Sequence, residues 1–188
     1  MFYEQNCSGR IGEKRTVICV VGSKEDVNFF RLISSLNLKY IKKELDEKSF
    51  SLALGLIKKY DILVSIIGIS PLEFNELKSR LLNYPHWFAK IYGIICYKAI
   101  KSILGQGYLQ MDREYDGRTL EISSKVILKL ASNKLEVYIR KENEYPTNRI
   151  IVADLFARGY FKGFNCKNII INKRPKLENE IKEIFKAR

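Results

Sequence analysis

Acidic side chains at three places in the chain have the types and spacing that could do chemistry. Asp112, Glu114 and Asp116 follow an apolar run at alternate positions, so an extended chain would turn all three carboxylates to one side. Such a set could hold a metal ion or form a polar turn. Asp116 precedes Gly117 and a helical pattern, and we therefore interpret it as a turn and helix-cap residue.

Two further acids lie in elements of their own. Glu4 is in the first apolar stretch, and Asp154 is inside the apolar helical pattern of residues 149–163. Metal-assisted phosphodiester cleavage needs carboxylates from separate elements, because Mg²⁺ and Mn²⁺ prefer oxygen ligands. Glu4, Asp112 and Asp154 are our candidate catalytic and metal-binding residues, with Glu114 as a spare ligand. The competing interpretation of Asp154 is an ion pair with Arg158, one helical turn further on.

The elements that must position these acids follow from the hydrophobic pattern. Residues 1–5 and 15–23 predict an N-terminal hairpin. Further strands are expected at residues 61–69, 108–112, 134–140 and 168–172, and helices at 24–36, 49–60, 71–83, 86–104, 118–132, 149–163 and 174–188. Ser70, Pro71 and Glu73 form the pattern of a capping box. This order predicts one three-layer α/β domain, a mixed sheet covered by helices.

The chain resembles the RNase H-like superfamily in the order of four short motifs. These are an N-terminal strand ending in an acid, the turn "SGRIG" before an apolar strand, the strand end "QMD" and the helix "VADLFARG". Within the superfamily the sequence is similar to the poorly characterised family with an N-terminal Asp-Glu-Ser-Gly strand and a C-terminal Ala-Asp-Leu helix. The resemblance spans roughly Met1 to Gly163.

This resemblance implies a mixed five-stranded sheet whose first three strands are antiparallel, with an acidic site for one or two Mg²⁺ or Mn²⁺ ions at its centre. It places the three acids at Glu4, Asp112 and Asp154. Glu4 stands where the family has aspartate, and the Ser8-Gly9 pair comes two residues later than in the family.

The charge of the chain indicates a polyanionic partner. Lys and Arg number 33 against 21 Asp and Glu, a formal net charge of +12, which attracts nucleic acid but also acidic lipids or proteins. We predict DNA or RNA as the partner, bound by four basic residues near the acids: Arg113, Arg118, Arg158 and Lys162. The predicted function is therefore a Mg²⁺- or Mn²⁺-dependent nuclease, or a nuclease-derived nucleic-acid-processing protein.

Two other functions fit the same residues. The first is a non-catalytic nucleic-acid-binding or assembly protein on the same fold. The second is a small-molecule or nucleotide-binding protein that uses the Gly22-Ser23 turn at a helix N-terminus. His86, the single histidine, is interpreted as structural rather than as a general acid or base.

Length and cysteine usage give the remaining expectations. A chain of 188 residues suits one folding unit, with residues 1–172 as the RNase H-like domain and residues 173–188 as a basic C-terminal helix packed on it. The four scattered cysteines predict buried free thiols in a reducing cytosol. We see no secretory signal and no membrane-spanning run, and expect a cytoplasmic protein. The Lys-rich, Ile-rich composition suits a thermophilic source or an AT-rich genome.

Overall fold

The structure is a computed structural model that describes most of the chain. It covers residues 2–8, 16–36, 45–103, 107–111, 115–132, 134–141, 145, 147–167, 169–172 and 175–185, with the backbone alone for residues 2–8 and 16. The strands are β1 (Phe2–Ser8), β2 (Thr16–Ser23), β3 (Ile62–Ile69), β4 (Gly107–Met111), β5 (Leu135–Ile139) and β6 (Ile170–Asn172). The helices are α1 (Val27–Leu36), α2 (Glu47–Lys59), α3 (Pro71–Leu81), α4 (Trp87–Lys101), α5 (Gly117–Leu130), α6 (Asn148–Phe161) and α7 (Glu178–Phe185).

The strands form one mixed sheet in the order β5-β4-β1-β2-β3-β6. The β1–β2 and β2–β3 pairs are antiparallel, and β4 lies parallel to β1, which confirms the predicted hairpin and the antiparallel arrangement of the first three strands. The sheet has six described strands, whereas the resemblance implied five. The sixth is β6, in the run of residues 168–172 where the pattern predicted a strand, and its residues 170–172 pair in parallel with the edge of β3.

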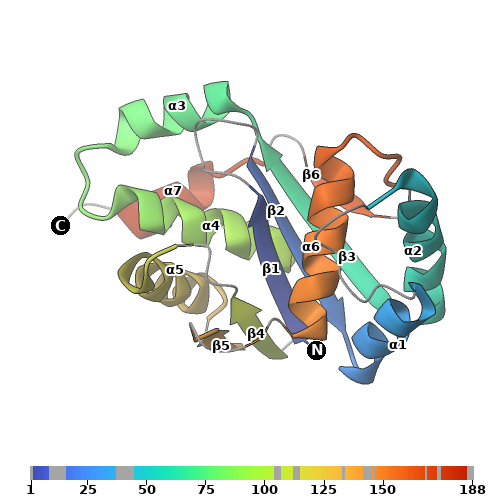
Figure 1. Cartoon of the computed structure of the whole chain (residues 1–188). Coiled ribbons are helices and arrows are strands. Elements are labelled where there is room, and N and C mark those ends of the chain that lie inside the picture. The colour runs from blue at the N-terminus through green and yellow to red at the C-terminus, as the bar shows by residue number, and fades with distance from the viewer. Residues whose placement is uncertain are drawn as a thin grey trace.

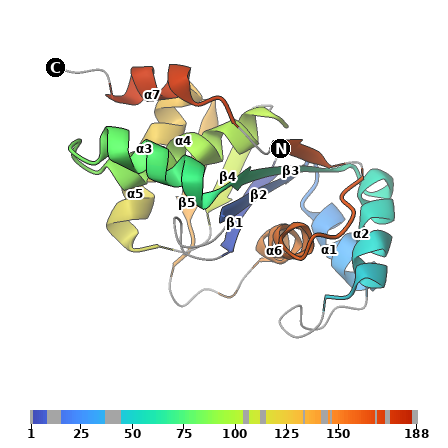
Figure 2. The ribbon, with the colours of Figure 1, turned by 90° about the horizontal axis from the view of Figure 1, so that it is seen from above.

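Helices cover both faces of the sheet, as predicted for a three-layer domain (Figures 1 and 2). One face carries α1, α2 and α6, and we call it the α6 face; the other carries α3, α4, α5 and α7, and we call it the α4 face. Strand β2 serves both, because alternate side chains enter opposite cores. Val17, Cys19 and Val21 enter the core under the α6 face, whereas Ile18 and Val20 enter the core under the α4 face.

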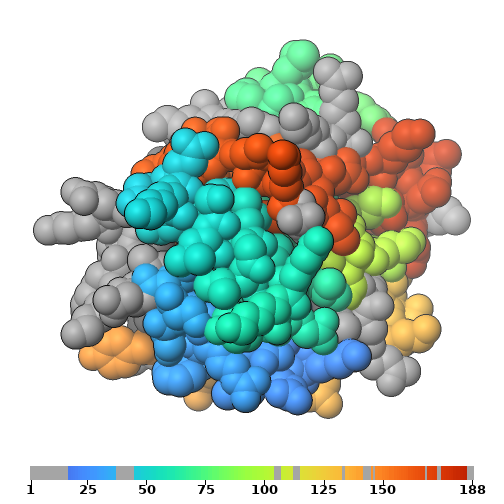
Figure 3. Space-filling model, turned by 90° about the vertical axis from the view of Figure 1, so that its right-hand side faces the viewer, coloured from blue at the N-terminus to red at the C-terminus, as the bar shows by residue number. Residues whose placement is uncertain are grey.

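Helix α4 is the central helix of its face because it is apolar on nearly every side. Ten of its residues are buried, among them Ile94, Ile95 and Cys96. It approaches α5 closely at Gly93, where an added Cβ would lie 2.7 Å from the Ser123 carbonyl oxygen. Glycine is therefore required for this helix contact. On the opposite side of the sheet, α1 and α2 form the outer surface, with the chain that follows α6 beside them (Figure 3).

Two helix starts match the local sequence signals. At α3, the Ser70 hydroxyl accepts a hydrogen bond from the Glu73 amide at 3.2 Å, and the Glu73 carboxylate accepts one from the Ser70 amide at 2.8 Å. This is the predicted capping box. At α5, Asp116 accepts a hydrogen bond from the Thr119 amide at 3.0 Å, which confirms the helix-cap interpretation of that acid.

Helix α1 differs from its prediction. It begins at Val27 rather than near Lys24, and Phe30, expected in the buried stripe, is 56% exposed. Asn28 is buried in its place, and its side-chain amide donates to the Ser23 hydroxyl at 2.9 Å. Ser23 is 1% exposed and its hydroxyl already serves this bond, so the Gly22-Ser23 turn gives no support to a nucleotide site.

The C-terminal helix packs on the α4 face. Leu177, Ile181 and Phe185 of this segment enter the core that α4 forms, and Lys98 of α4 forms an ion pair with Glu180 at 2.8 Å. The division of the chain into a domain of residues 1–172 and a C-terminal helix of residues 173–188 stays a prediction. Within the described parts of the chain, no helix is long and apolar enough to cross a membrane.

Candidate metal and nucleic-acid site

The three elements that carry the predicted acids contact one another. Strand β1 lies between β2 and β4, and its Gln5 pairs with Met111, the residue before Asp112. Helix α6 packs on β1 and β2 and runs in the same direction as β1 (Figure 1). The fold therefore brings the strand of Glu4, the end of β4 and the helix of Asp154 to one part of the sheet.

Glu4 lies in the middle of its strand rather than at its end. The prediction of a strand that ends in an acid was wrong, because the ladder with β2 continues to Ser8, which pairs with Val17. The backbone of Glu4 is paired with Gln110 of β4. With a rise of about 3.3 Å per residue, Glu4 is two residues, or roughly 6.6 Å, short of Asn6 along the strand.

The Asp154 carboxylate lies near Cys19 of β2. Burial raises the pKa of the Cys19 thiol well above its ordinary value, and the charges of nearby Asp154 and then of Cys166 raise it further. Cys19 is the register partner of Asn6 in β1.

The Asp154 carboxylate is mostly buried and ion-paired. Its side chain is 19% exposed, and Arg158 Nε donates to Oδ2 at 2.6 Å across one helical turn. The interpretation of this acid as an i,i+4 partner of Arg158 is thus confirmed.

Part of the predicted metal site lies outside the described residues. Asp112, Arg113 and Glu114 lie outside the described residues, as does the side chain of Glu4. Among the residues with described side chains, no three His, Cys, Asp or Glu are grouped as metal ligands would be. In donor chemistry the predicted set does fit Mg²⁺ or Mn²⁺, since all of its members are carboxylates, and Asp154 offers one on the inner side of α6.

The predicted basic residues have different surroundings. Arg158 is beside Asp154, as described above. Arg118 is exposed and lines a cavity of about 320 Å³ at the start of α4 and α5, with its Nη2 3.4 Å from His86 Nε2. Lys162, at the far end of α6, donates to the Leu45 carbonyl at 2.8 Å. The nucleic-acid roles of all three stay predictions.

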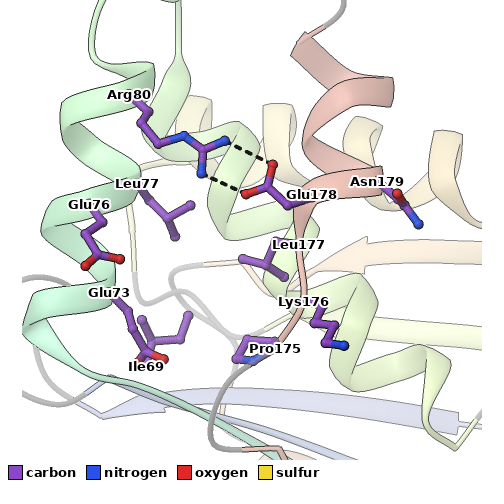
Figure 4. A pocket seen from close by; sticks show the side chains of 10 residues that line it. All are labelled: Ile69, Glu73, Glu76, Leu77, Arg80, Pro175, Lys176, Leu177, Glu178 and Asn179. Atoms are coloured by element: carbon purple, nitrogen blue, oxygen red, sulfur yellow. Dashed lines mark hydrogen bonds and ion pairs between the residues drawn. The ribbon is translucent and has the colours of Figure 1, made fainter.

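Another pocket has acidic walls but lies elsewhere. It occupies about 350 Å³ between α3 and α7, and the side chains of Glu73, Glu76 and Glu178 line it (Figure 4). Glu73 is used in the capping box, and Glu178 accepts two hydrogen bonds from Arg80, at 2.7 and 3.0 Å. Two of the three acids are thus occupied by structural contacts, and the pocket is not interpreted as a second metal site.

Sequence reasoning missed several polar and aromatic residues near the end of β4. The Tyr108 and Tyr138 rings stack with centroids 6.2 Å apart, and Arg149 Cζ lies 5.7 Å from the centroid of Tyr108. Thr147, the N-cap of α6, donates to the Gln110 side-chain oxygen at 3.2 Å. The alternation of β5 placed Tyr138 on the polar side of its strand, but only the pairing of β4 with β5 brings Tyr108 beside it.

The same overall fold occurs in two solved ribonuclease H structures. The chain aligns over its full length with the RNase HII of Archaeoglobus fulgidus, determined in complex with PCNA, at 14% identity and a TM-score of 0.59, covering 78% of that protein. It also aligns over its full length with a mutant Bst-RNase HIII at 12% identity and a TM-score of 0.59. Our chain spans about 62% of the length of that RNase HIII.

These likenesses establish the fold and nothing finer. No protein-family model and no curated protein matches the sequence. The chain therefore has an RNase H-like fold, as its motifs predicted, while the more specific family with the Asp-Glu-Ser-Gly strand is not confirmed.

Proposed function

We propose that the protein is a Mg²⁺- or Mn²⁺-dependent nuclease that cleaves phosphodiester bonds in DNA or RNA. The observation that carries this proposal is the meeting of β1, β4 and α6, the three acid-bearing elements, in a fold shared with two ribonucleases H. The net charge of +12 supports a polyanionic substrate.

In this proposal Asp112 and Asp154 are the inner ligands and Glu4 reaches them from one pleat earlier on β1. A glutamate suits that offset because its side chain is one methylene longer than that of aspartate. Glu114 is a spare ligand. When bound, the metal ions would activate a water molecule and stabilise the leaving oxygen.

Arg158 has two roles in this proposal. Its bond to Asp154 Oδ2 fixes the orientation of that carboxylate. Its side chain is still 40% exposed, so the guanidinium could also approach a phosphate. Arg113, Arg118 and Lys162 complete the proposed nucleic-acid contacts.

A cleavage assay on the full chain tests the proposal. Single- and double-stranded DNA and RNA are incubated with Mn²⁺, with Asp112→Asn as the inactive variant. Removing a ligand should cost at least the roughly 10- to 100-fold that loss of a ligand-orienting group costs. Asp116→Asn is the matched control, because Asp116 caps α5 and asparagine is also a good cap. Equal cleavage by the wild type and Asp112→Asn would refute the proposed site.

The individual ligands are separated by two further variants. Asp154→Asn should lose activity as Asp112→Asn does. Full activity in Glu4→Gln would remove Glu4 from the site and leave the two aspartates as its ligands.

The competing function is a non-catalytic nucleic-acid-binding or assembly protein on the same fold. The position of Glu4 in mid-strand and the ion pair at Asp154 favour it. Binding without cleavage of any of the four substrates would select this function.

We also propose a cytoplasmic location, supported by the free thiols of Cys19, Cys96 and Cys166. Cys19 and Cys96 are buried as predicted, whereas Cys166 is half-buried. The division of the chain at residue 173 and a thermophilic source stay predictions.

A further inference from the structure

The helix layer on the α6 face does not extend over the whole sheet. Helix α6 packs on β1, β2 and β3, and α1 and α2 continue the layer beyond it. The start of α6 reaches β4, where Thr147 donates a hydrogen bond to Gln110 and Arg149 lies over Tyr108, but no described helix packs extensively on this side of β4 and β5 (Figures 1 and 2). Leu109, Met111 and Leu135 point into the opposite core, so the intervening side chains of these strands lie on the α6 side.

Four side chains lie on this side of β4 and β5, and we call them the tyrosine face: Tyr108, Gln110, Tyr138 and Arg149. Gln110 is buried, at 5% exposed, so the other three supply the accessible part. The two tyrosine rings are stacked at 24°, and both residues are half-buried, so part of each ring is exposed. Arg149 Cζ lies 5.7 Å from the Tyr108 centroid. The face therefore combines aromatic rings with a cation.

The arginine of this face is held in place. Its Nε donates to Asp26 Oδ1 at 2.6 Å, and its side chain is only 13% exposed. Contacts therefore run without a break from the Asp26–Arg149 ion pair, through the Tyr108 ring, to the Tyr138 ring. Binding to a fixed surface of this kind loses little side-chain freedom, which favours affinity.

The tyrosine face leads to the proposed metal site. Gln110 is two residues before Asp112 on the same chain and is the register partner of both Glu4 and Tyr138. The Arg140 amide, two residues after Tyr138, donates to the Met111 carbonyl at 3.0 Å. A ligand lying along this face would therefore arrive at the end of β4, where Asp112 follows.

A stacked cross-strand pair also stabilises a sheet, but that role requires neither a fixed cation nor a position beside the acids. We infer that the tyrosine face binds the unpaired bases of a nucleic acid strand and directs its backbone toward the proposed carboxylate site. Exposed aromatic side chains stack on bases of any sequence, and basic charge tracks the backbone. This inference rests on the proposed function for the direction of the strand, while the binding itself requires no catalysis.

Binding in EDTA tests the inference separately from cleavage. Fluorescence anisotropy would measure the affinity of the full chain for labelled oligothymidylate and for a duplex of the same length. Tyr138→Leu and Tyr108→Leu should each weaken single-strand binding at least about fivefold, and Tyr138→Phe should retain it because the ring remains. Tyr84→Leu is the matched control: Tyr84 is 40% exposed and contacts Phe185 on the α4 face.

Each outcome decides the inference. Wild-type affinity in both leucine variants would overturn it, as would an equal loss in Tyr84→Leu or a failure of the wild type to bind oligothymidylate. A duplex preference that the tyrosine variants leave unchanged would also overturn it. Tyrosine-dependent binding without cleavage would uphold the inference and exclude the nuclease, whereas cleavage without such binding would do the reverse.

Cross-linking of the unaltered protein provides a measurement that does not depend on the variants folding. An oligonucleotide carrying 5-iodouracil is irradiated with the wild-type chain, and the cross-linked peptides are identified by mass spectrometry. Cross-links at Tyr108 or Tyr138 support the inference. Cross-links confined to other peptides contradict it.

Discussion

The two faces of the sheet are both covered by helices over an apolar core, but they differ in the polar residues that they carry. Under the α4 face, α4 and α5 touch at Gly93 and α7 closes the layer with buried apolar side chains. Under the α6 face, the core where α1, α2 and α6 lie is equally apolar, but α6 also carries an acid, and the described helices pack mainly on β1, β2 and β3. The α4 face is a structural layer, whereas the α6 face combines a core with polar and aromatic residues beside β4.

The largest expected effect tests whether both helix layers are equally packed. Phe156 of α6 and Ile95 of α4 are fully buried on opposite faces. Phe156→Ala should lower the free energy of unfolding by about 3–5 kcal/mol and Ile95→Ala by about 2–5 kcal/mol, as measured by urea denaturation. A loss below about 1 kcal/mol for Phe156→Ala alone would show that the α6 layer is not a true core.

The ion pairs of the two faces should differ in how much they contribute to the free energy of unfolding. Lys98 and Glu180 are largely buried, with side-chain exposures of 21% and 9%, and among the described residues Glu180 Oε2 has no hydrogen-bond partner. Lys98→Gln leaves a buried carboxylate without its cation and should cost about 3–5 kcal/mol of stability. Arg158→Gln breaks an i,i+4 pair whose arginine is 40% exposed and should cost less, about 1 kcal/mol, because solvent screens the pair.

Urea denaturation of both variants measures this difference, with the double change Lys98→Met and Glu180→Leu as the control. The double variant should recover most of the stability, because no buried charge remains. Equal losses for Lys98→Gln and Arg158→Gln would mean that the pair at Asp154 is structural too, which would weaken its proposed role at the metal site.

The smallest effect concerns matched caps on the two faces. Hydrogen bonds from Ser49 lower the pKa of Asp46 at the start of α2, and hydrogen bonds from Thr119 lower the pKa of Asp116 at the start of α5. A lowered pKa in the folded state adds stability above the ordinary aspartate pKa of about 3.9. That stability is lost as the pH falls through the lowered value.

Melting temperatures between roughly pH 2 and pH 6 measure this dependence. Asp46→Asn and Asp116→Asn should each reduce the fall in melting temperature over that range, since an amide does not titrate. A pH profile identical to that of the wild type in both variants would contradict the assigned cause of these pKa shifts.

Local signals in the sequence were sufficient for most elements. Ser70, Pro71 and Glu73 specified the start of α3, and Asp116 was recognised as a cap, because each of these interactions joins residues within one turn. The central position of α4 followed from its apolar sides. The Asp154–Arg158 pair was also foreseen as one of two interpretations, since both residues lie on the same helix.

The differences arose where partners are distant in the chain. The two glycines of residues 6–12 indicated a turn, yet the ladder with β2 keeps Asn6 and Ser8 in β1. The apolar run at residues 168–172 predicted a short strand, but nothing local shows that it joins this sheet, because its partner is β3. For the same reason the tyrosine face was not predicted: Tyr108, Tyr138 and Arg149 meet only through the pairing of β4 with β5 and the placement of α6.

The central position of β1 also affects how the chain can fold. Residues 2–5 have their parallel partners at residues 108–111, so more than half of the chain must be made before the N-terminal strand is paired on both edges. Contacts of such long sequence separation slow folding and leave an exposed strand edge in the meantime. The β1–β2 hairpin can form early, while the pairing of β1 with β4 must wait until residue 111 has been made.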